Sequence, residues 1–174
     1  MSLIYLKQGS KNNIDRYMDI IHNAQANMQR AGFNQWMNGY PDRSNISDDL
    51  AKENLYEIIF NNQTAGILAI QTTPEPNYAK IYDGSWSKDQ QYATIHRFAI
   101  DDHFAGHHLG DSALMCAFAL IRQMGLNYVR IDTHAKNGRM KHLIEKAGFA
   151  YRGVIHINDP HGNLETVGYD LSLL

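Results

Sequence analysis

The spacing of apolar positions predicts four helices. Apolar residues recur at helical spacing over residues 14–28, 109–124 and 140–147, and a repeat of this period lines one side of a helix. Ser44 or Ser47 can cap a further short helix. The helix over 109–124 has no charged side chain between Asp111 and Arg122, so we expect most of its surface to be buried.

Short β-prone runs between these helices predict seven strands. They cover residues 3–7, 55–60, 65–71, 92–100, 128–133, 149–157 and 165–173. Residues 61–64 are typical of a hairpin turn, and the turn-rich segment 158–163 joins the last two strands. The polar segment 73–89 interrupts the pattern and is long enough to be a functional loop or an ordinary surface loop.

The stretch from Tyr92 to Met124 reads as a strand, a glycine-bearing loop and a helix. Amide groups in the first turn of a helix have no partner inside the helix, and the helix dipole adds partial positive charge there. We therefore expect the loop to hold a phosphate group. The loop has neither the Gly-Lys-Ser/Thr ending of a P-loop nor the three-glycine dinucleotide fingerprint, so these two classes are not favoured.

Residues 98–111 resemble motif A of the GNAT superfamily of acyl-CoA-dependent N-acyltransferases. That motif runs roughly Val-x-Pro-x-Tyr-Arg-Gly-x-Gly-x-Gly, and residues 100–110 here read Ile-Asp-Asp-His-Phe-Ala-Gly-His-His-Leu-Gly. Residues 137–149 resemble motif B, which starts with Asn and ends in Glu-Lys-x-Gly-Phe. The resemblance implies the GNAT fold. This is an α/β fold with a central mixed sheet, flanking helices, and fourth and fifth strands that splay apart to admit pantetheine.

The resemblance also implies the reaction, which is direct transfer of an acetyl (acyl) group from acetyl-CoA to a primary amine of a small acceptor. The residues that it implies for binding acetyl-CoA are Phe98, Ile100, Ala105, Gly106, His107, His108, Leu109, Gly110, Asp111, Asn137 and Met140. A backbone N–H near Phe98 or Ala99 would face the thioester oxygen. His108 stands where the family has a glycine, and only glycine adopts a positive φ freely, so the side chains of His107 and His108 are alternative donors to phosphate.

His96 is the preferred catalytic base, because an amine with a pKa of roughly 10.4 arrives protonated and must lose a proton before attack. Strict alternation along the strand would place His96 on the same face as Phe98 and Ile100. It resembles the strand histidines that relay protons in arylalkylamine acetyltransferases of this superfamily. A buried structural histidine is an equally good interpretation. Other candidate bases are Asp132, Glu57 and Asp83.

The general acid is not evident, because Ile144 occupies the position at which the family usually has a tyrosine. Tyr82, Tyr128 or water are the alternatives, since a thiolate with a pKa of roughly 8.5 is a tolerable leaving group. A protein without the acid is also consistent with a non-catalytic acyl-CoA binding or sensing module. A nucleotide-phosphate binder that uses the same loop is the third interpretation.

Four aromatic residues are predicted to line the acceptor site. Trp36 and Tyr40 lie in the segment 35–41, which mixes aromatic and turn-forming residues, and Tyr82 and Trp86 lie in the segment 73–89. Trp36 could equally fill a gap between helices. The sequence does not identify the amine.

Length and charge narrow the class of protein. A chain of 174 residues is normally one domain, so we expect a single domain over 1–174. The net charge is −2, without a long basic run, so nucleic acid is not an expected partner. The first residues contain too short an apolar run for a signal peptide, and no later run reaches a membrane-spanning length. With one cysteine and therefore no intrachain disulfide, the chain is expected to be cytoplasmic.

Two further features are interpreted as structural. His103, His107 and His108 lie close together in sequence but lack the carboxylate or further ligands that metal sites add, so no metal is predicted. Cys116 lies within an apolar helix and is interpreted as a core residue rather than a nucleophile. A homodimer through the C-terminal strands or an exposed sheet edge stays open.

Overall fold

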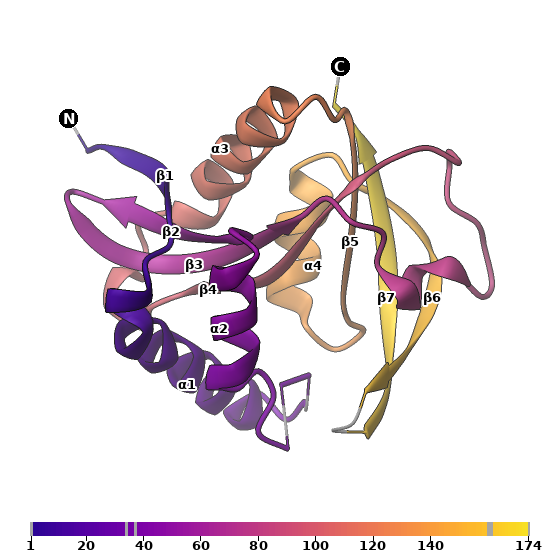
Figure 1. Cartoon of the computed structure of the whole chain (residues 1–174). Coiled ribbons are helices and arrows are strands. Elements are labelled where there is room, and N and C mark those ends of the chain that lie inside the picture. Colours follow the sequence, from indigo (N-terminus) through magenta and orange to yellow (C-terminus); the bar gives the residue numbers. More distant parts are fainter. Residues whose placement is uncertain (1, 34, 37, 160–161, 174) are drawn as a thin grey trace.

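A seven-stranded mixed sheet runs through the molecule (Figure 1). The computed structural model describes residues 2–33, 35–36, 38–159 and 162–173. The strands are β1 (Ile4–Gln8), β2 (Leu55–Phe60), β3 (Gln63–Gln71), β4 (Ala93–Ile100), β5 (Tyr128–His134), β6 (Ala150–Asp159) and β7 (Gly162–Ser172), in the order β1-β2-β3-β4-β5-β7-β6. The pair β4–β5 is parallel, and the other neighbouring pairs are antiparallel.

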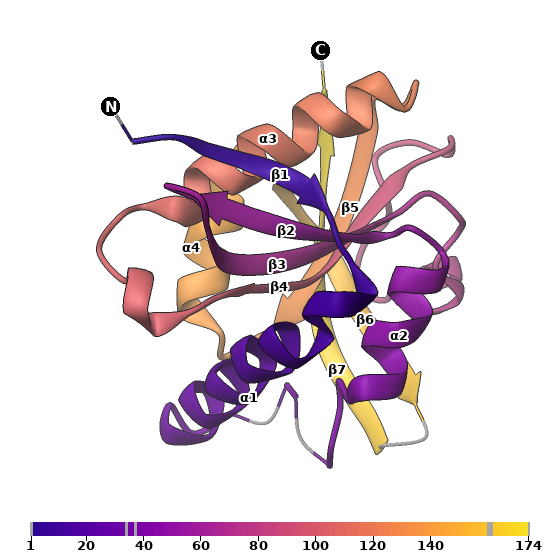
Figure 2. The same ribbon diagram turned by 60° about the vertical axis from the view of Figure 1, so that its left-hand side comes forward.

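Two helices cover each face of the sheet (Figure 2). The helices are α1 (Ile14–Arg30), α2 (Arg43–Ala51), α3 (Leu109–Gln123) and α4 (Gly138–Lys146), and the short 3-10 turns are η1 (Lys11–Asn13), η2 (Pro76–Ala79) and η3 (Asp102–Phe104). α1 and α2 pack on the face that carries Ile67 and Ala69 of β3. α3 and α4 pack on the face that carries Leu68 and Ile70. Burial of these apolar faces is the main favourable contribution to folding.

Strand β4 contains a bulge that reverses the alternation of its side chains. In its pairing with β3, His96 lies opposite Ala69 and Ala99 lies opposite Ile67, so one extra residue is accommodated between them. Arg97 lies in this bulge with a φ of 50°. Because a bulge shifts the alternation by one residue, His96 shares a face with Ala99. The prediction that His96 shares a face with Phe98 and Ile100 was therefore wrong.

Strands β4 and β5 separate soon after they begin to pair. Their register includes only Ala93 opposite Val129 and Thr94 opposite Arg130. Beyond this point the two strands diverge, as the resemblance implied. The divergence leaves an opening at the carboxyl ends of the two parallel strands, where ligands of α/β sheets commonly bind.

Side-chain caps mark the starts of α2 and α4. Asp42 caps α2 through a reciprocal capping box with Asn45, so the predicted caps Ser44 and Ser47 were wrong. The predicted cap of α4 is confirmed, because the Asn137 side chain accepts a hydrogen bond from the backbone N–H of Met140. No helix within the described ranges is long and apolar enough to cross a membrane. In the predicted link 158–163, residues 160–161 lie outside the described residues.

Candidate functional site

A groove of about 750 Å³ lies at the carboxyl end of β4, beside the segment that follows β5. It is bounded by the end of α1, the loop before α3, and α4. The residues that the sequence predicted for acetyl-CoA and that line this groove are Phe98, Ile100, Ala105, Gly106, His108, Leu109, Gly110, Asp111, Asn137 and Met140. The structure thus brings together residues from both sequence motifs.

His107 is the predicted cofactor residue that does not line the groove. Its ring is exposed and lies against the Phe60 ring, with 5.0 Å between the ring centroids. In this arrangement its side chain contacts the end of β2.

Two residues of the loop before α3 adopt a left-handed backbone conformation. Gly106 has a φ of 83°, and His108, the N-cap residue of α3, has a φ of 52° and a ψ of 32°. His108 therefore adopts the positive φ for which the sequence argument required a glycine. A Cβ atom added to Gly110 would lie 3.1 Å from Leu143 Cδ2, so α3 approaches α4 closely. The loop presents the N-terminus of a fifteen-residue helix to the groove.

Buried Asp101 holds the start of this loop. Its carboxylate contacts an Arg16 guanidinium nitrogen at 2.5 Å, the His103 backbone N–H at 3.0 Å and the His103 ring nitrogen Nδ1 at 2.7 Å. Burial alone would raise the pKa of Asp101, but the hydrogen bonds from His103 and Arg16 outweigh it and hold that pKa below its usual value. A charged Asp101 thus ties β4 and η3 to α1.

A second cavity of about 330 Å³ adjoins the groove. The two share four lining residues, which are Met28, Phe98, Asn137 and Met140. Trp36 and Tyr40, two of the predicted acceptor residues, line this second cavity, which we call the acceptor cavity.

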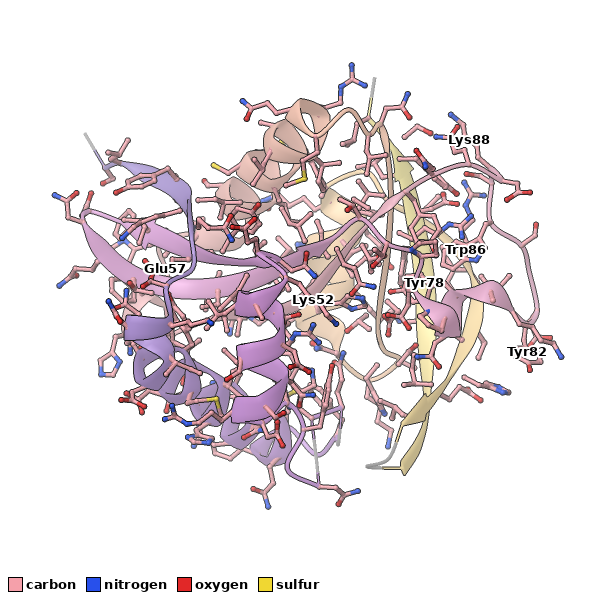
Figure 3. The ribbon with its side chains drawn as sticks, viewed as in Figure 1. Lys52, Glu57, Tyr78, Tyr82, Trp86 and Lys88 are labelled. Atoms are coloured by element: carbon pink, nitrogen blue, oxygen red, sulfur yellow. The ribbon has the colours of Figure 1, made fainter. Side chains whose placement is uncertain are left out.

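Tyr82 and Trp86 do not line the acceptor cavity. Tyr82 stacks on the His156 ring at a centroid distance of 4.2 Å, and it lies at the outer edge of the β3–β4 connection (Figure 3). Trp86 lies beside Tyr78, and its indole N–H donates a hydrogen bond of 2.9 Å to the Tyr78 carbonyl. Trp86 therefore contacts Tyr78, which lines the cavity, but does not line the cavity itself.

His96 lies in the wall of the acceptor cavity. Its Nε2 atom is shielded from solvent and lies 3.4 Å from a carboxylate oxygen of Glu75, an ion-pair distance without hydrogen-bond geometry. Glu75 accepts hydrogen bonds from the Asn77 backbone N–H at 3.1 Å and side-chain amide at 2.9 Å. Burial raises the pKa of Glu75, but the contacts with His96 and Asn77 outweigh this effect and the pKa is lowered. Glu75 is therefore a fixed carboxylate beside the imidazole.

Tyr78 and Asp132 form a second pair in the cavity wall. The Tyr78 hydroxyl donates a hydrogen bond of 2.5 Å to Asp132, and the Tyr78 side chain is fully buried. Burial, followed by the charge of Asp132, raises the pKa of Tyr78 well above its usual value. Tyr78 therefore keeps its proton and orients the Asp132 carboxylate.

The bulge residue Arg97 is anchored by two side chains. Its guanidinium donates a bidentate pair of hydrogen bonds to Asp49 of α2 and a further hydrogen bond of 2.9 Å to the Tyr40 hydroxyl. The Arg97 and Asp49 side chains are only 13% and 6% exposed. Burial raises the pKa of Tyr40, although Arg97 opposes this effect. The ion pair fixes the bulge against α2.

The other candidate acids and bases lie outside both cavities. Glu57 is buried on β2, where it accepts hydrogen bonds from Tyr17 and Asn13, and it lies on the opposite side of the molecule from Tyr78 (Figure 3). Asp83 is exposed. Tyr128 donates a hydrogen bond of 2.5 Å to Asp170.

Two positions that bear on the chemistry are structural. Ile144 is fully buried in the core between the sheet and the α3–α4 layer.

Cys116 is partly buried, and burial raises the pKa of its thiol, which does not favour a nucleophile. Within the described ranges, no three histidine, cysteine or acidic side chains are grouped as a metal site requires.

The residues of the acceptor cavity that sequence reasoning missed include Glu75, Tyr78, Arg97 and Thr166. The sequence Glu75-Pro76 does carry a local signal, because Glu75 caps η2 and Pro76 opens it. No local signal indicates the partners of Tyr78 and Arg97, which lie 54 and 48 residues away in sequence.

Comparisons with known proteins agree with this architecture. The sequence model of the acetyltransferase (GNAT) family matches residues 22–149. A GNAT-family acetyltransferase from Streptococcus agalactiae is 30% identical, with a TM-score of 0.89, and the match covers 98% of this chain and 96% of that one. No curated protein sequence gives a match.

Two more distant structures share the fold. A GNAT-family acetyltransferase from Listeria monocytogenes has a TM-score of 0.73 at 18% identity, covering 98% of this chain and 95% of that one. An aminoglycoside acetyltransferase solved in complex with coenzyme A has a TM-score of 0.66 at 17% identity, with the same two coverages. The family match, the relative at 30% identity and the diverging fourth and fifth strands together show that this chain belongs to the GNAT acetyltransferase family.

Proposed function

We propose that the protein transfers an acetyl group from acetyl-CoA to a primary amine of a small acceptor. The observation that carries this proposal is the junction of the groove and the acceptor cavity at Phe98, Asn137 and Met140. A donor in the groove would present its thioester at this junction, and an amine in the cavity would meet it there.

The groove suits acetyl-CoA in two respects. Gly106 and His108 turn the loop so that amides at the start of α3 can hold the pyrophosphate. The diverging strands leave backbone groups of Phe98 and Ile100 available to pair with pantetheine. The relative solved with coenzyme A shares this fold, which supports the same donor here.

His96 is the proposed base. Its Nε2 faces Glu75, so the neutral ring would carry its proton on Nε2 and accept the amine proton at Nδ1. Glu75 has a lowered pKa and stays ionised, so it would stabilise the imidazolium that forms. This arrangement supports general-base catalysis, which typically contributes about 10²–10⁴-fold to the rate.

The neutral amine then attacks the carbonyl carbon of the thioester. A backbone N–H of the bulge, at Phe98 or Ala99, would stabilise the oxyanion, where one such donor contributes about 3–4 kcal/mol. The C–S bond breaks as the carbonyl re-forms, the thiolate leaves, and the nitrogen, which became positively charged on attack, loses its second proton to water. Ile144 cannot donate a proton, so the thiolate would be protonated by water, which its ordinary pKa of roughly 8.5 permits.

His96→Ala tests the base. The affinity for acetyl-CoA, measured by calorimetry, should stay within about twofold, because the side chain lies outside the groove. Amine-dependent thiol release should fall by about 100-fold at neutral pH and lose the limb of the pH–rate profile that reports the imidazole. His22→Ala, at an exposed position of α1, is the matched control. An unaltered pH–rate profile would remove His96 from the mechanism.

The second candidate function is a non-catalytic acyl-CoA binding or sensing module. The observation that favours it is Ile144, which is buried in the core at the position of the family's usual acid. Tight binding of acetyl-CoA without thiol release, across a panel of monoamines, diamines and peptides, would support this function over acetyl transfer.

A further inference from the structure

We propose that the acceptor amine carries a second positive charge, and that Asp132 and Thr166 form the subsite that binds this charge. The inference rests on the proposed function, because it names the class of amine that the same cavity takes. It predicts that the substrate is a short aliphatic diamine or a similar small dication.

Asp132 lies across the opening from the proposed base. Thr94 and Arg130 are the last paired residues of β4 and β5, and two residues further along each strand lie His96 and Asp132. Both line the acceptor cavity, one from each diverging strand. An amine held for deprotonation at His96 would therefore extend its remaining chain toward β5.

Thr166 supplies an independent sign of a polar ligand. Its side chain is 1% exposed and lines the acceptor cavity, yet its hydroxyl makes no hydrogen bond within the described part of the chain. In the β5–β7 pairing Thr166 lies opposite His134 and Gly168 lies opposite Asp132. Thr166 and Asp132 are thus diagonal neighbours on one face of the sheet. A buried hydroxyl without a partner is costly, and a ligand donor would satisfy it.

The guanidinium group in the wall of the cavity is already neutralised by an ion pair. Arg97 is the arginine in the lining, and it is paired with Asp49. Within the described residues, neither Glu75 nor Asp132 forms an ion pair with lysine or arginine. The cavity therefore presents two carboxylates, one beside the base and one on the opposite wall.

Asp132 is held in place before any ligand binds. The hydroxyl of buried Tyr78 donates to it. The Tyr78 ring centroid lies 5.4 Å from that of Trp86 and 6.3 Å from that of Tyr92, and Figure 3 shows Trp86 beside Tyr78. A preorganised carboxylate loses little entropy on binding an ammonium group. An ammonium carries three N–H donors and no acceptor, so it can satisfy Asp132 and Thr166 together.

The size of the cavity limits the chain between the two charges. A volume of about 330 Å³ is at the small end of ligand pockets. The aromatic rings of Trp36, Tyr40 and Tyr78 in its lining suit a short methylene chain and attract cations.

The test compares three amines of similar length with the full chain and acetyl-CoA. Putrescine carries a second ammonium, butylamine carries a methyl group in its place, and γ-aminobutyrate carries a carboxylate. Charge-assisted hydrogen bonds predict that kcat/KM for thiol release is about 10–100-fold higher for putrescine than for butylamine, and lowest for γ-aminobutyrate. Equal values for putrescine and butylamine would overturn the inference while leaving the acetyltransferase intact.

Two variants locate the subsite. Asp132→Asn keeps an acceptor for the Tyr78 hydroxyl but removes the charge, and it should bring the putrescine-to-butylamine ratio to within about threefold of unity. The loss should appear mainly in KM. Asp15→Asn, which removes one charge at an 84% exposed side chain, should keep the ratio. If Asp132→Asn instead lowers kcat for all amines equally, Asp132 is the base and the inference fails.

Thr166→Val separates ligand binding from a structural role. Loss of an unpaired hydroxyl should leave the protein as stable or more stable, while KM for putrescine rises. An unchanged KM would remove Thr166 from the subsite. If no amine releases thiol, the acetyltransferase proposal fails, and calorimetry on CoA-saturated protein decides the subsite. Putrescine binding that exceeds butylamine binding and is lost in Asp132→Asn supports it, and any other result overturns it.

Discussion

Removal of the Asp49 carboxylate tests whether the β4 bulge depends on a buried ion pair. Asp49→Ala leaves the Arg97 guanidinium in a site that is largely closed to water, where it still donates a hydrogen bond to the Tyr40 hydroxyl. The variant keeps the α2 backbone and its Asp42 cap. The measured change therefore reports the loss of the pair.

The expected cost follows from the burial of both partners. Breaking a buried pair by removal of one partner costs about 3–5 kcal/mol, because the other charge is left uncompensated. Arg97 is 13% exposed and keeps its bond to Tyr40, so we expect the lower end, about 3 kcal/mol. For a chain of this length, that loss corresponds to a fall in Tm of about 6–12 °C.

Urea and thermal unfolding provide the measurement, with Asp48→Ala as the control. Asp48 is the preceding residue of the same helix and is exposed, so the control reports the effect of alanine on helix propensity alone. Arg97→Ala and the double variant complete a cycle whose coupling free energy should be about 2–3 kcal/mol. If Asp49→Ala is no more destabilising than Asp48→Ala, the ion pair does not hold the bulge and the reasoning is refuted.

Two further predictions concern the loop before α3. His108→Gly should raise the unfolding free energy by between zero and about 1 kcal/mol, because relief of left-handed strain at His108 is partly offset by the conformational entropy of glycine. The control His107→Gly, at a residue outside the left-handed conformation, should only destabilise the protein. A clear loss of stability for His108→Gly in urea unfolding would contradict the strain argument. Asp101 has a lowered pKa in the folded protein, so its ionisation stabilises the fold above about pH 4 and this contribution is lost as the pH falls through the folded pKa. Arg16→Ala should raise that pKa and move the acid-unfolding midpoint to higher pH, whereas Arg43→Ala, in an exposed pair, should not; equal midpoints for the two variants would exclude the role of Arg16.

Strands and helices with a clear period were predictable from sequence. The predicted strand over 55–60 is confirmed without change, and the helix over 109–124 ends one residue earlier than expected, at Gln123. The apolar spacing of α3 marks its buried side, whereas all six residues of β2 are buried and show no such side. The Asn137 cap was equally predictable, because its side chain bonds only three residues ahead.

The arrangement of the acceptor cavity was not predictable in this way. The left-handed conformation of Arg97 is not a preference of arginine, and it is accompanied by an ion pair with a residue 48 positions earlier. One extra residue then moved His96 to the other face of the sheet. The position of Tyr78 depends likewise on Asp132. Such contacts between distant residues leave no local trace in the pattern of apolar positions.

The shared boundary of the groove and the acceptor cavity has a consequence for the order of binding. Met28, Phe98, Asn137 and Met140 line both the groove and the acceptor cavity. A pantetheine arm lying along β4 would therefore become part of the surface that the amine touches. The free enzyme would offer the amine an incomplete site, so steady-state kinetics should follow a compulsory sequence in which the donor adds first and CoA leaves last.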